Sequence, residues 1–252
     1  MKKLISSFFG AIVFYTIIPV SDFFPLEFNK IARWLPYIGI LLGCFLALIA
    51  KFFTLIDIPS LTKAVLIVCC WIFLTGGLHL DGVMDTADGL GVQNPEKRLE
   101  VMRDSNSGAF GVMAGIMVIA LKIASISEIN HYLWISLIIT ASYARWGQLM
   151  AIALYPYVRK EGKGVFLKEN LNLPIDVIFS SLFMIILIIT QYFFLNQTLT
   201  VISLTLLISI IISLFMGWWF NKQLGGHTGD TYGATVEWSE ALILCALTVL
   251  NH

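Results

Sequence analysis

Long apolar runs, almost free of charge, limit what this chain can fold into more than any other feature. The stretch from Val177 to Phe194 contains no charged residue and is apolar on nearly every side of a helix. A helix needs about 20 such residues to cross a lipid bilayer. A membrane β-strand would need only about 10, in strict alternation, and this run does not alternate. We therefore expect an all-α fold, a polytopic bundle of transmembrane helices.

Eight stretches of this kind predict about seven to eight membrane segments in a single integral membrane domain over residues 1–252. The first stretch follows two lysines, as in a signal peptide, but no small-residue cleavage site follows it. We therefore expect it to be retained as a membrane segment. The expected segments are 4–20, 34–53, 61–80, 108–127, 133–155, 174–195, 199–220 and 235–250.

The composition supports a bilayer as the surroundings of this chain. Charged residues make up 13% of the sequence and hydrophobic residues 58%, whereas a soluble domain carries about 25% charged residues. Sixteen basic residues balance sixteen acidic ones, which argues against a nucleic-acid partner. The four cysteines lie in apolar stretches and are expected to be small buried residues. The sequence leaves the oligomeric state open.

Most of the charge lies in connections on one side of the expected bundle. Alternating the eight segments puts 21–33, 81–107, 156–173 and 221–234 on the same face. Ten lysines and arginines fall on that face and four on the other, so the positive-inside rule predicts that it is cytoplasmic. The ten are Lys30, Arg33, Lys97, Arg98, Arg103, Arg159, Lys160, Lys163, Lys168 and Lys222, and the four are Lys2, Lys3, Lys51 and Lys63.

The first motif, GGLHLDGVMDTADGL over 76–90, carries three aspartates with helical spacing. Asp81, Asp85 and Asp88 fall within roughly 60° of one another on a helix. Three like charges on one stripe repel, and a divalent cation would relieve the repulsion; carboxylate oxygens favour Mg²⁺, Mn²⁺ or Ca²⁺ over zinc. We therefore predict a metal site, against the alternative of a solvated acidic turn. His79 is expected to face away from it as a hydrogen-bonded interfacial residue.

The second motif, GGHTGDTYGATVEWSE over 225–240, combines glycines with acidic residues. Gly-rich backbone leading into a helix suits a phosphate group, because free N–H groups point outward there. Glu237 shares a helical face with Asp230, and acidic residues inside an apolar segment need a charged partner or a metal. A helix cap with interfacial acids is the alternative. The predicted binding residues here are Gly225, Gly226, Thr228, Gly229, Asp230 and Glu237.

Three further places could contribute to a site. Arg145 lies inside an expected membrane segment and should face a phosphate or a carboxylate in the bundle interior. Arg103 and Asp104 follow the first motif, where a helix cap would explain Asp104 equally well. The loop 159–164 is basic and flexible, which suits phosphate but also a positive-inside loop. Lys122 is expected to snorkel towards the membrane surface.

Together these features indicate metal-assisted phosphoryl transfer. The carboxylates could bind a cation, the basic groups could bind phosphate, and the glycines would let the substrate approach the backbone closely. The sequence has no P-loop, no HExxH motif and no Rossmann fingerprint.

These motifs, with MRDSNSGAFGV over 102–112, resemble the cobalamin synthase family, the adenosylcobinamide-GDP ribazoletransferases. The resemblance covers essentially the whole chain. It implies a magnesium-dependent enzyme of the bacterial inner membrane in late vitamin B12 biosynthesis. Such an enzyme joins adenosylcobinamide-GDP to α-ribazole, or to its 5′-phosphate, and releases GMP.

By motif, the resemblance makes Asp81, Asp85 and Asp88 the metal-site carboxylates and catalytic residues, without saying which one acts as the base. Two positions depart from the family pattern, since Ile17 and Asn106 stand where the family commonly has arginine. The cations that could replace those arginines are Arg103, Arg145 and Arg159.

Two other functional classes remain open from the residues. Another metal-dependent membrane enzyme, a CDP-alcohol phosphotransferase or a prenyltransferase, would also use an Asp-rich motif. An ion-coupled transporter would use Arg145, Glu237 and Glu240 as a charge path and would move solute without forming a product.

Overall fold

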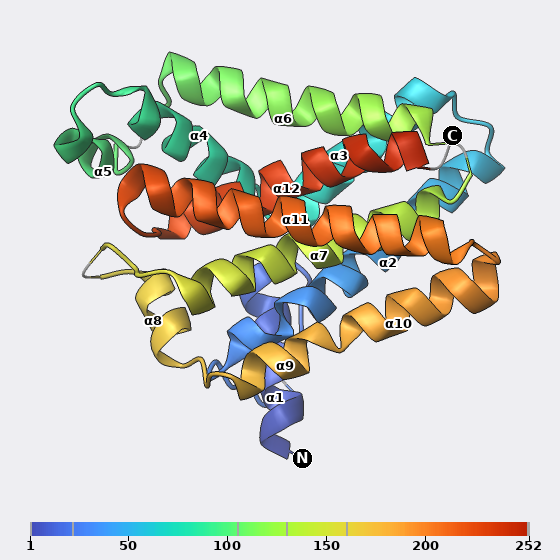
Figure 1. The fold of residues 1–252 in the computed structure, drawn as a ribbon, viewed down its shortest axis with the longest axis horizontal. Coiled ribbons are helices and arrows are strands. Elements are labelled where there is room, and N and C mark those ends of the chain that lie inside the picture. Colours follow the sequence, from blue (N-terminus) through green and yellow to red (C-terminus); the bar gives the residue numbers. More distant parts are fainter. Residues whose placement is uncertain (1, 22, 105, 130, 160, 251–252) are drawn as a thin grey trace.

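The protein is an α-helical bundle whose longest helices lie side by side (Figure 1). The computed structural model describes residues 2–21, 23–104, 106–129, 131–159 and 161–250. In these ranges the only strand-like pairing is an isolated parallel bridge between Tyr157 and His227. The all-α, polytopic membrane fold is thus confirmed.

Six helical segments of the described ranges are long and apolar enough to cross a membrane, or seven if one bent pair counts as a single span. The first is a 3₁₀ turn, Ile31–Trp34, that continues into α2, Leu35–Leu55. The others are α6 (Ala109–Glu128), α7 (Leu133–Leu154), α11 (Leu199–Leu224), α12 (Gly229–Leu250) and a composite of α9 (Ile175–Ser181), α10 (Phe183–Ile189) and the π-helical turn Thr190–Phe194.

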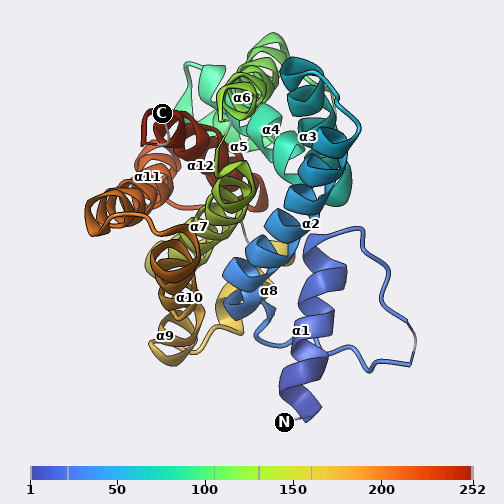
Figure 2. The ribbon, with the colours of Figure 1, turned by 90° about the vertical axis from the view of Figure 1, so that its right-hand side faces the viewer.

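The first expected segment, 4–20, is a shorter helix than predicted. Helix α1 covers Lys2–Tyr15, 14 residues, which is about 21 Å at 1.5 Å per residue. A bilayer core is about 30 Å thick. Helix α1 therefore does not cross a bilayer by itself, and it lies at the edge of the bundle beside the start of α2 (Figure 2).

The expected segment 61–80 is broken. Helix α3 (Ser60–Leu74) and helix α4 (Leu78–Gly91) meet at 90°. Gly76 and Gly77 between them have φ values of 63° and 70°, a left-handed conformation that glycine adopts without steric cost. Because α4 extends to Gly91, the first part of the connection that we expected over 81–107 is helical. A 3₁₀ turn, Pro95–Lys97, and the short helix α5, Arg98–Val101, follow it.

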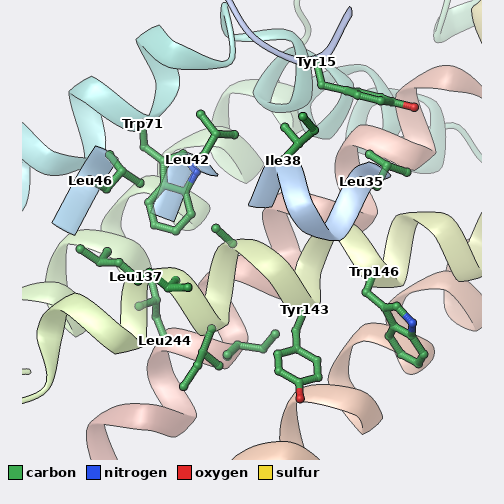
Figure 3. Close-up of a cluster of buried hydrophobic side chains, with 14 of the residues drawn as sticks. Tyr15, Leu35, Ile38, Leu42, Leu46, Trp71, Leu137, Tyr143, Trp146 and Leu244 are labelled. Carbon is green, nitrogen blue, oxygen red and sulfur yellow. The ribbon is translucent and has the colours of Figure 1, made fainter. Parts of the chain in front are cut away.

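Helix α7 is the centre of the bundle and packs against α2, α11 and α12. Its contact with α2 is close because α2 carries two glycines four residues apart: a Cβ atom on Gly39 would lie 2.4 Å from the Ala141 carbonyl oxygen, and one on Gly43 would lie 2.5 Å from Ile138 Cα. Figure 3 shows the apolar core at this contact, where Trp71 of α3 lies against α2 side chains. Small residues let membrane helices approach in this way.

The three chemically distinctive connections lie at one end of the bundle. Figure 1 shows the connections after α4, α7 and α11 at the left-hand end, and those after α6 and α10 at the right-hand end. Helix α8, Lys163–Glu169, belongs to the connection after α7. The fold therefore brings the two sequence motifs and the basic loop to the same end.

Candidate active site

The two sequence motifs meet where α4 crosses α12. A Cβ atom on Gly82 would lie 2.5 Å from the carbonyl oxygen of Asp230, and one on Gly233 would lie 3.0 Å from His79 Cα. Each helix therefore carries a glycine at the point where its partner's backbone touches it. This crossing joins residues about 150 positions apart in the sequence.

Carboxylates from both helices gather beside the crossing. Asp81 and Asp85 lie one turn apart on α4, and Asp230 lies in the first turn of α12. Asp85 interacts electrostatically with Asp81, Asp88 and Asp230, all of the same sign, and with Arg159 of the opposite sign. The helix expected for the three aspartates is present, and α12 adds a fourth carboxylate to their face.

Asp88 has a structural role that the sequence did not reveal. Its two oxygens accept hydrogen bonds from the backbone N–H groups of Gly108 and Gly111, at 2.7 and 2.8 Å. The carboxylate thus caps the start of α6, where negative charge is favourable. Each oxygen keeps a further lone pair, so metal binding by Asp88 stays a prediction beside this capping role.

Arg159 is the cation that the structure places at these carboxylates. It donates a 2.7 Å hydrogen bond to Asp230 Oδ2 and a 3.3 Å hydrogen bond to the Met102 carbonyl oxygen. Its loop is fixed to the second motif, because Val158 N–H donates to the His227 oxygen at 2.9 Å and His227 N–H to the Pro156 oxygen at 2.8 Å. Lys160, in the same loop, lies outside the described residues.

The glycines of the second motif shape the turn between α11 and α12. Gly225 ends α11 with φ 72°. A Cβ atom on Gly226 would lie 2.6 Å from the Pro156 oxygen, so the absence of a side chain permits the contact with the Arg159 loop. Gly229 is the first residue of α12 and lines the cavity described below.

Thr228 and His227 fix the start of α12 from inside the bundle. Thr228 Oγ1 accepts a hydrogen bond from Thr231 N–H at 3.2 Å, while its own N–H donates to Thr231 Oγ1 at 2.8 Å. Burial lowers the pKa of His227 to about 4, which makes this side chain neutral at pH 7. Its Nε2–H then donates to the Gly217 oxygen at 3.0 Å. Thr228 acts as a cap here, whereas phosphate binding by Thr228 stays a prediction.

Arg145 and Glu237 belong to a buried ionic cluster rather than to the wall of the cavity. Arg145 donates to Glu240 Oε1 at 2.7 Å, and Lys122 donates to Glu237 Oε2 at 2.6 Å and also to Glu240. The Lys122 ammonium lies over the Trp71 ring, 4.7 Å from its centroid. The sequence predicted a phosphate or a carboxylate as the partner of Arg145, and in the structure the partner is the carboxylate of Glu240. Lys122 does not snorkel, since it is 1% exposed.

Arg103 and Asp104 lie in the turn that follows α5. Both are exposed, and Asp104 accepts two hydrogen bonds from Asn106, from its backbone N–H at 3.0 Å and its side-chain amide at 2.8 Å. Neither residue lines the cavity beside the crossing. Asp104 therefore closes its own turn and does not cap α6, whose first turn is held by Asp88.

A cavity of about 290 Å³ opens beside the carboxylates. Asp81, Asp230, Arg159 and Glu161 line it together with neutral polar and aromatic side chains. Four of these are residues whose role the sequence did not indicate: Tyr15, His79, Gln148 and Tyr232. His79 is buried, and its Nδ1 has no hydrogen-bond partner among the described residues, which corrects the expected interfacial position. Tyr15 and Gln148 belong to apolar helices, where no local pattern marks them, whereas Tyr232 lies inside the second motif without being singled out by it.

Substituting Gly82 tests the crossing. Gly82→Ala places a methyl group against α12 backbone, which cannot move like a flexible side chain, so we expect a loss of about 1–3 kcal/mol of stability and at least a tenfold loss of turnover. The matched control is Gly115→Ala, whose Cβ atom would meet Met84 at an ordinary 3.4 Å. Thermal unfolding in detergent and initial rates provide the measurements. A Gly82→Ala protein as active as Gly115→Ala would mean that the crossing distance is unimportant.

The chain is similar to known proteins over nearly its whole length. The family model described as "Cobalamin-5-phosphate synthase" matches residues 7–248. Adenosylcobinamide-GDP ribazoletransferase from Trichormus variabilis is 45% identical over all of both chains. The enzyme of the same name from Synechocystis is 44% identical over 96% of this chain and 94% of its own. That from Brevibacillus brevis is 36% identical over 96% of this chain and 97% of its own.

No solved structure matches the chain. The family model nevertheless spans both motifs, the loop of Arg159 and all six apolar helical segments. The chain belongs to the cobalamin-5-phosphate synthase family.

Proposed function

We propose that this chain is an adenosylcobinamide-GDP ribazoletransferase of the bacterial inner membrane, with its active site facing the cytoplasm. Family membership makes it a transferase. The proposed reaction joins adenosylcobinamide-GDP to α-ribazole, or to α-ribazole 5′-phosphate, and releases GMP. One observation supports this proposal above the others: three carboxylates and a guanidinium lie together beside one cavity. They belong to Asp81, Asp85, Asp230 and Arg159.

The donor chemistry of the site fits magnesium. Mg²⁺ prefers oxygen ligands and is usually held by one or two carboxylates together with substrate phosphates and water. No group of three His, Cys, Asp or Glu side chains within the described ranges is close enough to enclose a metal ion. Asp81 and Asp85 would hold the ion, and Asp230 would join them when Arg159 turns to a phosphate. When bound, the ion would supply charge neutralisation at the diphosphate.

The side chains of this protein would then do three things. Arg159 binds the diphosphate, since a guanidinium matches phosphate oxygens with paired donors. An aspartate of α4 accepts the proton of the attacking ribazole hydroxyl. That oxygen bonds to the phosphorus next to cobinamide, the bond from that phosphorus to the bridging oxygen breaks, and the bridging oxygen leaves with GMP. The negative face of α4 also favours the metal-bound form of the diphosphate over the free anion.

A direct assay tests the proposal. Protein purified in detergent or nanodiscs is mixed with MgCl₂, adenosylcobinamide-GDP and α-ribazole, and GMP and the joined product are measured together. We expect equal amounts of both, and none without either substrate. Removal of magnesium with EDTA should stop turnover, and added MgCl₂ should restore it. Solute flux into proteoliposomes without GMP would favour a transporter instead.

Labelling tests the orientation. In a protein whose four cysteines are replaced, Gln93→Cys and Lys222→Cys place thiols at the site end, and His131→Cys places one at the opposite end; all three positions are exposed. We expect a membrane-impermeant maleimide to label only His131→Cys in spheroplasts and all three after lysis. Labelling of Gln93→Cys before lysis would contradict a cytoplasmic active site.

A further inference from the structure

We propose that the inner wall of the cavity, formed by Tyr15, His79, Gln148 and Tyr232, is the subsite for the neutral nucleoside that supplies the attacking hydroxyl. The inference rests on the proposed function. It assigns one of the two substrates to a part of the cavity and leaves the other substrate outside.

The first argument is the unmet hydrogen-bonding capacity of this wall. All four side chains line the cavity and are at most 4% exposed. The Tyr15 and Tyr232 hydroxyls, His79 Nδ1 and Gln148 Oε1 have no hydrogen-bond partner among the described residues. Buried polar atoms are nearly always bonded, because an unpaired one costs about 1–3 kcal/mol. Four such atoms on one wall indicate a ligand that carries donors and acceptors.

The second argument is charge. The charged residues that line the cavity are partly or fully exposed at its mouth, whereas the four buried residues of the inner wall are uncharged polar groups. The charged residues are Asp81, Arg159, Glu161 and Asp230. Gln148 Oε1 only accepts hydrogen bonds, and each tyrosine hydroxyl donates one and accepts others. These groups match the hydroxyls of a sugar. An anionic diphosphate would instead be drawn to Arg159 and to a cation that Asp81 would hold at the mouth.

The third argument is shape. Aromatic rings flank the wall, with the Tyr157 and Tyr232 centroids 5.9 Å apart and the Phe14 and Tyr15 centroids 4.8 Å apart. The rings of each pair are in contact with each other, so a flat heteroaromatic base would pack against a ring that lines the cavity and not between the two. A volume of about 290 Å³ lies at the lower limit of small-molecule pockets, about 300 Å³. It suits one nucleoside and excludes a corrinoid.

The position of the wall relative to the carboxylates completes the inference. His79 precedes Asp81 by two residues on α4, and Tyr232 follows Asp230 by two on α12. Residues two apart point to different sides of a helix, and it is the cavity that joins them, since Asp81 and Asp230 line it together with the four side chains of the wall. A hydroxyl held at the wall therefore lies in the same cavity as an α4 carboxylate, Asp81, that can accept its proton. The phosphorus to be attacked then approaches from the mouth.

Steady-state kinetics of conservative variants test this assignment. Tyr15→Phe, Tyr232→Phe and Gln148→Met each remove one polar atom and keep the shape. We expect each to raise KM for α-ribazole about five- to tenfold, the value of one hydrogen bond, and to change KM for adenosylcobinamide-GDP less than twofold. The matched control is Tyr143→Phe, which alters another buried tyrosine of the bundle core that does not line the cavity.

Equilibrium dialysis with labelled α-ribazole in EDTA separates binding from turnover. We expect wild type and Asp81→Asn to bind it equally, although with MgCl₂ present Asp81→Asn turns over far more slowly. The Tyr15→Phe, Gln148→Met double variant should bind at least twentyfold more weakly at an unchanged melting temperature. A rise in KM for adenosylcobinamide-GDP alone, or unchanged dialysis in the double variant, would overturn the inference. Absence of GMP from wild type would instead overturn the proposed function, while dialysis would still report on the wall.

Discussion

Asp81→Asn and Asp230→Asn are each expected to lower turnover at least about a hundredfold while the protein stays folded in the membrane. Asparagine keeps the shape of the side chain and removes the charge that would hold a cation or accept a proton; the loss of one electrostatic contribution in an active site costs about 10²–10³ in rate. Initial rates of GMP release at limiting and saturating MgCl₂ measure the effect. Saturating MgCl₂ should recover part of the rate if metal affinity is what is lost.

Two measurements can show that the loss of turnover does not come from misfolding: the melting temperature and the rate of a control variant. The Asp230–Arg159 pair is partly exposed, and such pairs contribute only about 0–1 kcal/mol, so the melting temperature should hardly change. Asp104→Asn is the matched control: Asp104 is exposed and lies outside the cavity, and its variant should keep a rate within twofold of wild type. Near-normal rates for both Asp81→Asn and Asp230→Asn at limiting MgCl₂ would exclude the carboxylate cluster as the active site.

The largest effect on stability is expected from Lys122→Met. This change keeps the length of the side chain and leaves Glu237 buried without its cation. Breaking a buried ion pair by removing one partner costs about 3–5 kcal/mol, which is a large share of the 5–15 kcal/mol that holds a typical domain folded. We expect a lower yield of folded protein and a clearly lower melting temperature in detergent.

A double variant shows whether Lys122→Met lowers stability because a carboxylate loses its cation or because packing is lost. In Lys122→Met with Glu237→Gln, the cation and one carboxylate are removed together, and Arg145 still pairs with Glu240. We expect this protein to be more stable than Lys122→Met alone. If the double variant is less stable by the sum of the two single losses, the side chains act independently and the cluster is not an ionic unit.

The sequence was sufficient to predict features that follow from local pattern. Apolar runs predicted the bundle, and the spacing of Asp81, Asp85 and Asp88 predicted their common helix. The break at Gly76 and Gly77 was missed because hydropathy continues across it, while only the backbone conformation interrupts the helix.

The features that sequence did not reveal are long-range contacts. Lys122 looked like a snorkelling residue because its carboxylate partners lie 115 and 118 positions away. Asp88 looked like its neighbours because the N–H groups that it caps belong to the next long helix. The inner wall of the cavity takes single residues from α1, α4, α7 and α12. His79 and Tyr232 lie inside the two motifs, but their place in one wall with Tyr15 and Gln148 depends on the packing of four helices.

The buried cluster of Lys122, Arg145, Glu237 and Glu240 also has a consequence for biogenesis. Its cations emerge from the ribosome with α6 and α7, whereas both counter-ions arrive only with α12, the last helix. Until then the nascent chain holds two uncompensated charges at the level of the lipid, which is costly. The arrival of α12 neutralises them and in the same step delivers Asp230 to α4. The carboxylate cluster is therefore complete only once the final helix is integrated, and a chain that ended before α12 would lack both Asp230 and the counter-ions of Lys122 and Arg145.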